Sequence, residues 1–144
     1  MTRKSAMLVS VQLVCIVILV VTGPVIPRQL WPLIAMCAGI TLIVWAVAKI
    51  RFYNLRIEPE PSKESRLITS GPFRLIRHPM YSGGMLIGVA WVWNDFSLLR
   101  LFMLVILFVD FLVKLHYEER LLTERFPEYA EYMKRTKRLV PFVY

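Results

Sequence analysis

The sequence predicts an all-α integral membrane protein, with four transmembrane helices in two hairpins and a cytosolic amphipathic helix near its C-terminal end. Hydrophobic residues make up 57% of the 144 residues, whereas a soluble domain is usually about 45–50% apolar. They gather in four runs, and the basic residues that give the net charge of +8 lie mainly between and after these runs. Basic residues in such places flank membrane helices, so we expect no nucleic-acid partner.

The first two apolar runs predict an N-terminal hairpin. The chain carries no charged side chain from Ser5 to Pro27, and a helix needs roughly 20 residues to cross a hydrocarbon core of about 30 Å. We expect a first membrane helix at about residues 6–24, not a cleaved signal peptide, because a second apolar run follows at once. After a short proline-containing turn, the uncharged residues 29–48 predict the second helix.

A polar connection separates this hairpin from a second one. Residues 51–79 are basic and contain Glu58-Pro59-Glu60-Pro61, where the prolines cannot continue a helix, so we expect a cytosolic loop. Residues 79–93 predict a short third helix with proline in its first turn, and residues 96–116 predict a fourth. From Tyr117 onward, apolar residues recur at helical spacing among charged ones, which predicts an amphipathic helix.

The positions of lysine and arginine predict the orientation of these helices. Of the 18 basic residues, 16 precede the first helix, lie in or beside the loop, or follow from Lys114 onward. Only Arg28 and Arg100 fall on the opposite side. Because cytosolic segments carry the excess of basic residues, we expect a multi-pass protein with both termini and the loop in the cytosol. The sequence has no CxxC motif or Cys/His cluster, so it predicts no metal site.

The densest group of polar and small residues lies where the loop enters the third helix. It reads Gly71-Pro72-Phe73-Arg74-Leu75-Ile76-Arg77-His78-Pro79-Met80-Tyr81-Ser82-Gly83-Gly84. A helix N-terminus beside Arg77 and His78 suits an anionic group. Gly83 and Gly84 allow a flat ligand or a neighbouring helix to approach closely. A basic interfacial anchor with a small-residue helix contact is the alternative.

A pair of adjacent acids lies at the cytosolic end of the fourth helix. Glu118 and Glu119 are unfavourable there, because the end of a helix prefers cations, and such a local conflict suggests a function. Pairing with nearby arginines or lysines is the structural alternative. Within the same apolar run, Asp110 lies four residues before Lys114, so we expect a structural ion pair between them.

The C-terminal residues form a third group. Arg135 and Arg138 lie close to Tyr129 and Tyr132, which is typical of a polybasic segment attracted to anionic lipid. The apolar residues 139–144 argue against a free tail. We expect them to fold back onto the membrane or into the domain.

Two of these groups carry a family resemblance. Arg77-His78-Pro79-Met80-Tyr81-Ser82-Gly83 has the pattern R-H-P-x-Y-x-G, and Glu118-Glu119 is followed by tyrosine, arginine and proline at family-like spacing. Over residues 65–144 the sequence resembles the isoprenylcysteine carboxyl methyltransferases and the related phospholipid methyltransferases. The length predicts a single domain over 1–144, made of the N-terminal hairpin 1–50, the cytosolic loop 51–79 and a part over 80–144, which the resemblance implies to be cofactor-binding.

The resemblance also implies an activity. The chain would be an S-adenosylmethionine-dependent methyltransferase that acts on a lipid or a lipidated small molecule at the cytosolic face of the membrane. The cofactor would be bound by six residues: His78, Pro79, Tyr81, Gly83, Glu118 and Glu119. Arg77, Arg135 and Glu118 would be catalytic, with the two arginines beside the acceptor. Which of the two glutamates contacts the cofactor stays open.

The acceptor stays open as well. A carboxylate acceptor is already ionised and needs orientation by arginines, as in O-methylation of an isoprenylcysteine. An amine acceptor, as in an aminophospholipid, must first lose a proton to a base such as Glu118, Glu119 or His78. Two other functions are weighed beside methyl transfer. They are an NADPH-dependent membrane reductase of the sterol reductase type and a small non-enzymatic four-helix transporter.

Overall fold

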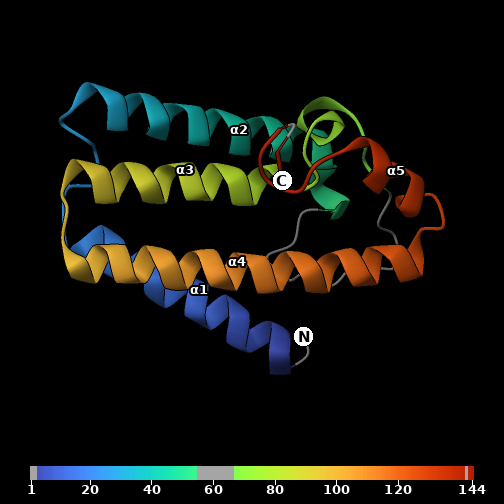
Figure 1. The fold of residues 1–144 in the computed structure, drawn as a ribbon, viewed down its shortest axis with the longest axis horizontal. Helices are drawn as coiled ribbons and strands as arrows, with labels where there is room; N and C mark the ends of the chain where they lie inside the picture. The colour runs from blue at the N-terminus through green and yellow to red at the C-terminus, as the bar shows by residue number, and fades with distance from the viewer. Residues whose placement is uncertain (1–2, 55–66, 142) are drawn as a thin grey trace.

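The described part of the chain is all-helical. The computed structural model describes residues 3–54, 67–141 and 143–144. Five α-helices and one short 3₁₀ helix occur there, and no β-strand is found among these residues. In chain order they are α1 (Arg3–Val21), α2 (Leu30–Asn54), η1 (Gly71–Arg74), α3 (Pro79–Asn94), α4 (Leu98–Arg125) and α5 (Tyr129–Arg135). Figure 1 shows α2, α3 and α4 running side by side, with α1 crossing α4.

The most extensive helix contacts run between the two predicted hairpins. α2 packs on α3 and α1 packs on α4, while α3 also lies beside α4. Two glycines allow the first of these contacts, because a Cβ atom on Gly83 would lie 2.7 Å from the carbonyl oxygen of Gly39. Such small residues let two helix backbones approach closely. The predicted hairpins are therefore present as connections, but the main packing joins one hairpin to the other.

The described core lies where α1, α3 and α4 meet. Buried side chains from these helices, including Cys15, Leu107 and Phe111, form one apolar cluster. Other large apolar side chains point outward along the helices, such as Trp45 and Phe102, which are 47% and 60% exposed. Contiguous apolar surface of this kind marks a protein or membrane contact.

Among the described residues, one helix is long and apolar enough to cross a membrane. It is α2, over Leu30–Ile50. The apolar part of α1, Ser5–Val21, is shorter, and α3 has 16 residues. α4 is long but carries three charged residues along its apolar length, namely Arg100, Asp110 and Lys114. The predicted set of four transmembrane helices is thus supported for α2, and the multi-pass topology stays a prediction.

The fourth helix is longer than the sequence predicts. The sequence predicts an end near residue 116, whereas α4 continues through both glutamates to Arg125. No proline or glycine interrupts this stretch before Pro127, and Arg120 forms a supporting ion pair with Glu124 one turn on, at 3.1 Å. The separate amphipathic helix is reduced to α5.

The loop before α3 is partly described. Its first residues extend α2 to Asn54, residues 55–66 lie outside the described residues, and η1 forms just before α3. At Gly71 the backbone adopts a φ of 65°, which glycine tolerates best. A Cβ atom there would lie 2.8 Å from Lys49 Cγ. The end of α2 and the loop are therefore in close contact.

Candidate active site

Main-chain pairing brings two distant segments together. Ile76 forms an isolated parallel β-bridge with Lys137. The N–H of Arg77 donates to the carbonyl oxygen of Lys137 at 2.7 Å, and the N–H of His78 donates to that of Arg138 at 3.1 Å. The Tyr132 hydroxyl donates to the carbonyl oxygen of Phe73 at 2.6 Å. The arginine–histidine–proline motif is therefore fixed against the segment that follows α5.

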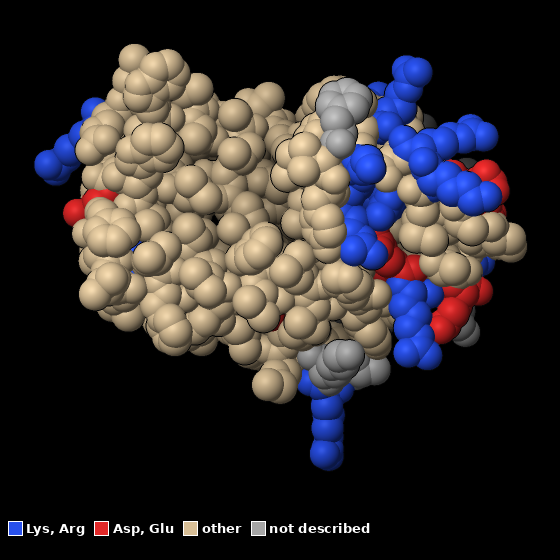
Figure 2. Space-filling model, viewed as in Figure 1, with Lys and Arg blue, Asp and Glu red and all other residues tan. Residues whose placement is uncertain are grey.

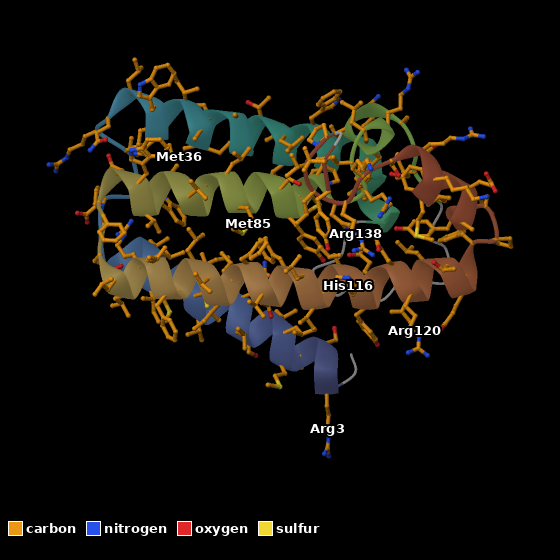
Figure 3. All side chains as sticks on the ribbon, in the orientation of Figure 1. Arg3, Met36, Met85, His116, Arg120 and Arg138 are labelled. Atoms are coloured by element: carbon orange, nitrogen blue, oxygen red, sulfur yellow. The ribbon has the colours of Figure 1, made fainter. Side chains whose placement is uncertain are left out.

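Glu119 is the centre of the resulting cluster. One of its oxygens, Oε1, accepts a hydrogen bond from Arg77 Nε at 2.7 Å and lies 3.3 Å from His78 Nε2. The other, Oε2, accepts from Arg138 Nε at 3.1 Å. The side chain of Glu119 is 7% exposed. Figure 3 labels Arg138, which belongs to the segment after α5 and lies beside α4. A buried carboxylate with three basic partners is neutralised on both oxygens.

These partners determine the ionisation of Glu119. Burial alone raises the pKa of a carboxyl group, because it disfavours the charged form. Hydrogen bonds from His78 and Arg77, together with their charge, outweigh burial and lower the pKa of Glu119 to about 2. At neutral pH this group is therefore a carboxylate and a very weak base.

Arg77 joins three parts of the chain. Besides Glu119 on α4, its guanidinium donates to the carbonyl oxygens of Met133 at 3.1 Å and Thr136 at 2.5 Å, near the end of α5. Its side chain is 8% exposed. The residue thus ties the start of α3 to α4 and to the end of α5.

Glu118 offers the more accessible carboxylate. Its side chain is 30% exposed. Its Oε2 atom accepts a hydrogen bond from the Tyr81 hydroxyl at 3.0 Å and lies 3.7 Å from His78 Nδ1. The His78 ring therefore lies between the two glutamates, with one nitrogen toward each. Two adjacent carboxylates consequently have different surroundings, one neutralised by arginines and the other partly open.

Aromatic stacking supports this open side. Tyr81 stacks against His78 at a centroid distance of 5.4 Å and against Phe111 at 5.0 Å. Lys114 Nζ lies 5.7 Å from the centre of the Tyr81 ring. The lysine is buried and donates a hydrogen bond to Gln12 Oε1 of α1 at 2.6 Å.

The prediction of an ion pair between Asp110 and Lys114 is wrong. No ion pair joins them in the described structure, because Lys114 turns to Gln12. Both carboxylate oxygens of Asp110 are buried and lack a hydrogen-bond partner among the described residues.

The structure brings most of the predicted site residues together. Arg77, His78, Tyr81, Glu118 and Glu119 form the cluster described above. Pro79 is buried at the first position of α3, directly beside it.

Two predicted residues lie elsewhere. Gly83 faces α2, where a Cβ atom would lie 2.6 Å from Ile43 Cγ1. The contact with a neighbouring helix, one of the two possibilities for this glycine, therefore accounts for it. Arg135 ends α5 with an exposed side chain, and no hydrogen bond joins it to the cluster in the described structure. Sequence reasoning did not assign a site role to Arg138, which contacts Glu119 instead.

Comparison with known proteins agrees with the motif. The sequence profile of the phospholipid methyltransferase family matches residues 28–129, which include Arg77, His78, Tyr81 and both glutamates. The chain belongs to the phospholipid methyltransferase family. Proteins of this family are membrane-associated methyltransferases.

A curated relative adds a partial match. Over 81 residues the chain is 32% identical to the cobalt-zinc-cadmium resistance protein CzcN of Cupriavidus metallidurans, strain CH34. The match covers 55% of this chain and 37% of that protein. The chain thus matches little more than a third of the length of this relative.

Proposed function

We propose that the protein transfers a methyl group from S-adenosylmethionine to an amine of a lipid-like acceptor at the cytosolic face of the membrane. The observation that carries this proposal is the unequal pair of glutamates. Glu119 is neutralised by Arg77 and Arg138, while Glu118 is partly open beside His78 and Tyr81. Family membership supports methyl transfer, and Glu118 and His78 supply the binding and acid–base groups that it needs.

The residues present fit the cofactor. S-adenosylmethionine carries an ammonium group and a carboxylate on its amino-acid part. Glu118 offers a carboxylate to the ammonium group. No side chain caps the start of α3, where His78 holds the N-cap position, so backbone N–H groups suit the cofactor carboxylate. When bound, the cofactor supplies an activated methyl on sulfonium for in-line displacement, which depends mainly on alignment.

A membrane setting fits the surface of the molecule. On the face drawn in Figure 2, the middle of the molecule carries almost no charged side chains, and basic and acidic residues gather at the end that holds α5. The span Leu30–Ile50 of α2 runs through this apolar middle. We propose that α1, α3 and α4 cross with α2, which leaves the cluster around Glu119 at the cytosolic face with both termini.

The geometry favours an amine acceptor over a carboxylate. Orienting a carboxylate needs free guanidinium groups, but Arg77 is engaged by Glu119 and by two main-chain carbonyls. Arg135 is exposed and lies outside the cluster. An ammonium group instead needs a base before it can attack. Glu119 is held by Arg77 and Arg138 and Glu118 is assigned to the cofactor, so we assign the proton to Nδ1 of His78, 3.7 Å from Glu118 Oε2.

Calorimetric titration with S-adenosylhomocysteine tests the cofactor, with NADPH titrated in parallel. We expect purified protein to bind S-adenosylhomocysteine and not NADPH. Glu118→Ala should weaken this binding at least tenfold while the helices stay folded by circular dichroism. Glu124→Ala is the matched control, because Glu124 forms an exposed ion pair with Arg120 at the surface. Binding of NADPH alone, or full binding by Glu118→Ala, would contradict the proposal.

A methylation assay tests the acceptor. Radiolabelled methyl donor is supplied with an aminophospholipid or with a prenylcysteine analogue, in separate reactions. We expect label that survives base treatment on the lipid amine. Base-labile label on the prenylcysteine alone would mean that the acceptor is a carboxylate.

A further inference from the structure

The segment after α5 ends in a small apolar surface. Residues 139–141 and 143–144, here called the C-terminal loop, turn back on themselves. The N–H groups of Leu139 and Val140 both donate to the backbone oxygen of Tyr144 at 2.7 Å. Val140 and Val143 are 50% and 75% exposed. The loop therefore has a defined conformation yet presents valine side chains outward.

Contacts with α3 give the depth of this loop. The Ser82 hydroxyl donates to the carbonyl oxygen of Leu139 at 2.6 Å. The next residue, Gly83, packs against Ile43 of α2. Ile43 lies seven residues before Ile50, the end of the apolar span of α2, and a helix rises about 1.5 Å per residue. Leu139 is therefore roughly 10 Å inside the end of that span, measured along α2.

Basic side chains flank the loop on its cytosolic side. Lys137 is exposed and precedes the loop, and its N–H donates to the carbonyl oxygen of Leu75 at 3.1 Å. Arg74, next to Leu75, is exposed too, and Leu75 adds an apolar side chain that is 49% exposed. Apolar residues with lysine or arginine beside them are the pattern that binds the boundary between acyl chains and anionic head groups.

The loop is also joined to the cluster around Glu119. Arg138 donates from Nη1 to the Tyr144 hydroxyl at 2.9 Å, and its guanidinium lies 5.3 Å from the centre of that ring. Through Nε the same arginine donates to Glu119 at 3.1 Å. Arg138 therefore bridges the loop and the buried carboxylate.

We propose that the C-terminal loop inserts into the cytosolic leaflet of the membrane and that this contact positions Arg138 on Glu119. The partner is a lipid bilayer that contains anionic lipid. The inference rests on the membrane setting proposed above, and it adds that lipid contact maintains the geometry of the site. Arg138 is thus a positioning residue, and Val140 and Val143 are the inserted side chains.

Spin-label accessibility tests the insertion without any need for activity. A nitroxide is attached at Val143→Cys in a Cys15→Ala/Cys37→Ala background, in bilayers that contain anionic lipid. We expect it to collide more with oxygen than with a water-soluble nickel chelate. The matched control is a label at Glu131→Cys, on the exposed side of α5, which should favour nickel. Nickel access at residue 143 equal to that at residue 131 would overturn the insertion.

Removing the apolar contact provides a second test. With the label moved to Val140→Cys, the variant Val143→Asp should shift accessibility from oxygen to nickel. An unchanged ratio would mean that Val143 does not anchor the loop. Because neither measurement depends on the cofactor, a failure here leaves the methyltransferase proposal standing, and a failure of cofactor binding leaves the insertion standing.

A double variant tests the link to the site. If the loop positions Arg138, then Val143→Asp and Arg138→Gln remove the same contact. Their combined shift in melting temperature in bilayers should then be no larger than that of the more affected single variant. Additive shifts would mean that the loop inserts without positioning Arg138.

Discussion

Replacing Glu119 with glutamine isolates the charge at the centre of the cluster. The amide keeps the shape of the side chain but leaves Arg77 and Arg138 facing each other without a negative charge between them. The difference between an ordinary pKa of 4.5 and the value of about 2 in the folded protein corresponds to about 3 kcal/mol of stability. Breaking a buried ion pair typically costs about 3–5 kcal/mol, which agrees. We expect Glu119→Gln to lose about 3 kcal/mol.

Thermal unfolding followed by circular dichroism measures this loss. For a chain of this size, about 3 kcal/mol lowers the melting temperature by roughly 6–12 °C. Glu131→Gln is the control, because its ion pair with Lys134 joins side chains that are 62% and 71% exposed and should contribute less than about 1 kcal/mol. If Glu119→Gln melts as high as this control, the carboxylate does not hold the segments together and the argument fails.

Three further outcomes are expected. Because the pKa of Glu119 is lowered, the stability that this carboxylate contributes is complete above about pH 4.5 and is lost as the pH falls toward 2. The melting temperature of the unaltered protein should therefore fall between these pH values. Glu119→Gln should not show this fall. Gly83→Ala should destabilise by about 1–3 kcal/mol in chemical unfolding, whereas Gly84→Ala, whose Cβ would lie 3.3 Å from the edge of the Phe111 ring, should cost less; equal losses would refute close packing at Gly83. Asp110→Asn should bind S-adenosylhomocysteine within twofold of the unaltered protein by calorimetry, and a large loss would give Asp110 a role in the site.

The sequence predicts the helices well where apolar runs have clear ends. Pro79 marks the start of α3 as expected, because proline fits the first turn of a helix and disfavours helical backbone angles at the residue before it. The end of α4 is not predicted correctly, because the polarity change at Tyr117 suggests a boundary that the helix does not have. Helical hydrogen bonding does not depend on side-chain polarity and continues until Pro127 stops it.

The members of the candidate site are predicted better than their partners. The resemblance puts His78 and the glutamates in one cofactor pocket, and the structure brings them together, with Arg77 paired to Glu119. The choice between Arg135 and Arg138 depends on where α5 ends and on the register of the bridge at Lys137, which spacing along the chain does not reveal. Likewise, a separation of four residues allows an ion pair between Lys114 and Asp110, but in the structure Lys114 donates a hydrogen bond to Gln12 of α1 instead.

The bridge between Ile76 and Lys137 has a consequence for how the protein tolerates change. The hydrogen bonds of the bridge itself join main-chain atoms, so they transmit position without regard to the side chains at residues 76 and 137. Most substitutions at Lys137 should therefore preserve the alignment, and proline, which lacks the N–H that donates to Leu75, should not. The segments around residues 76 and 137 can therefore change in sequence and still keep the same relative position.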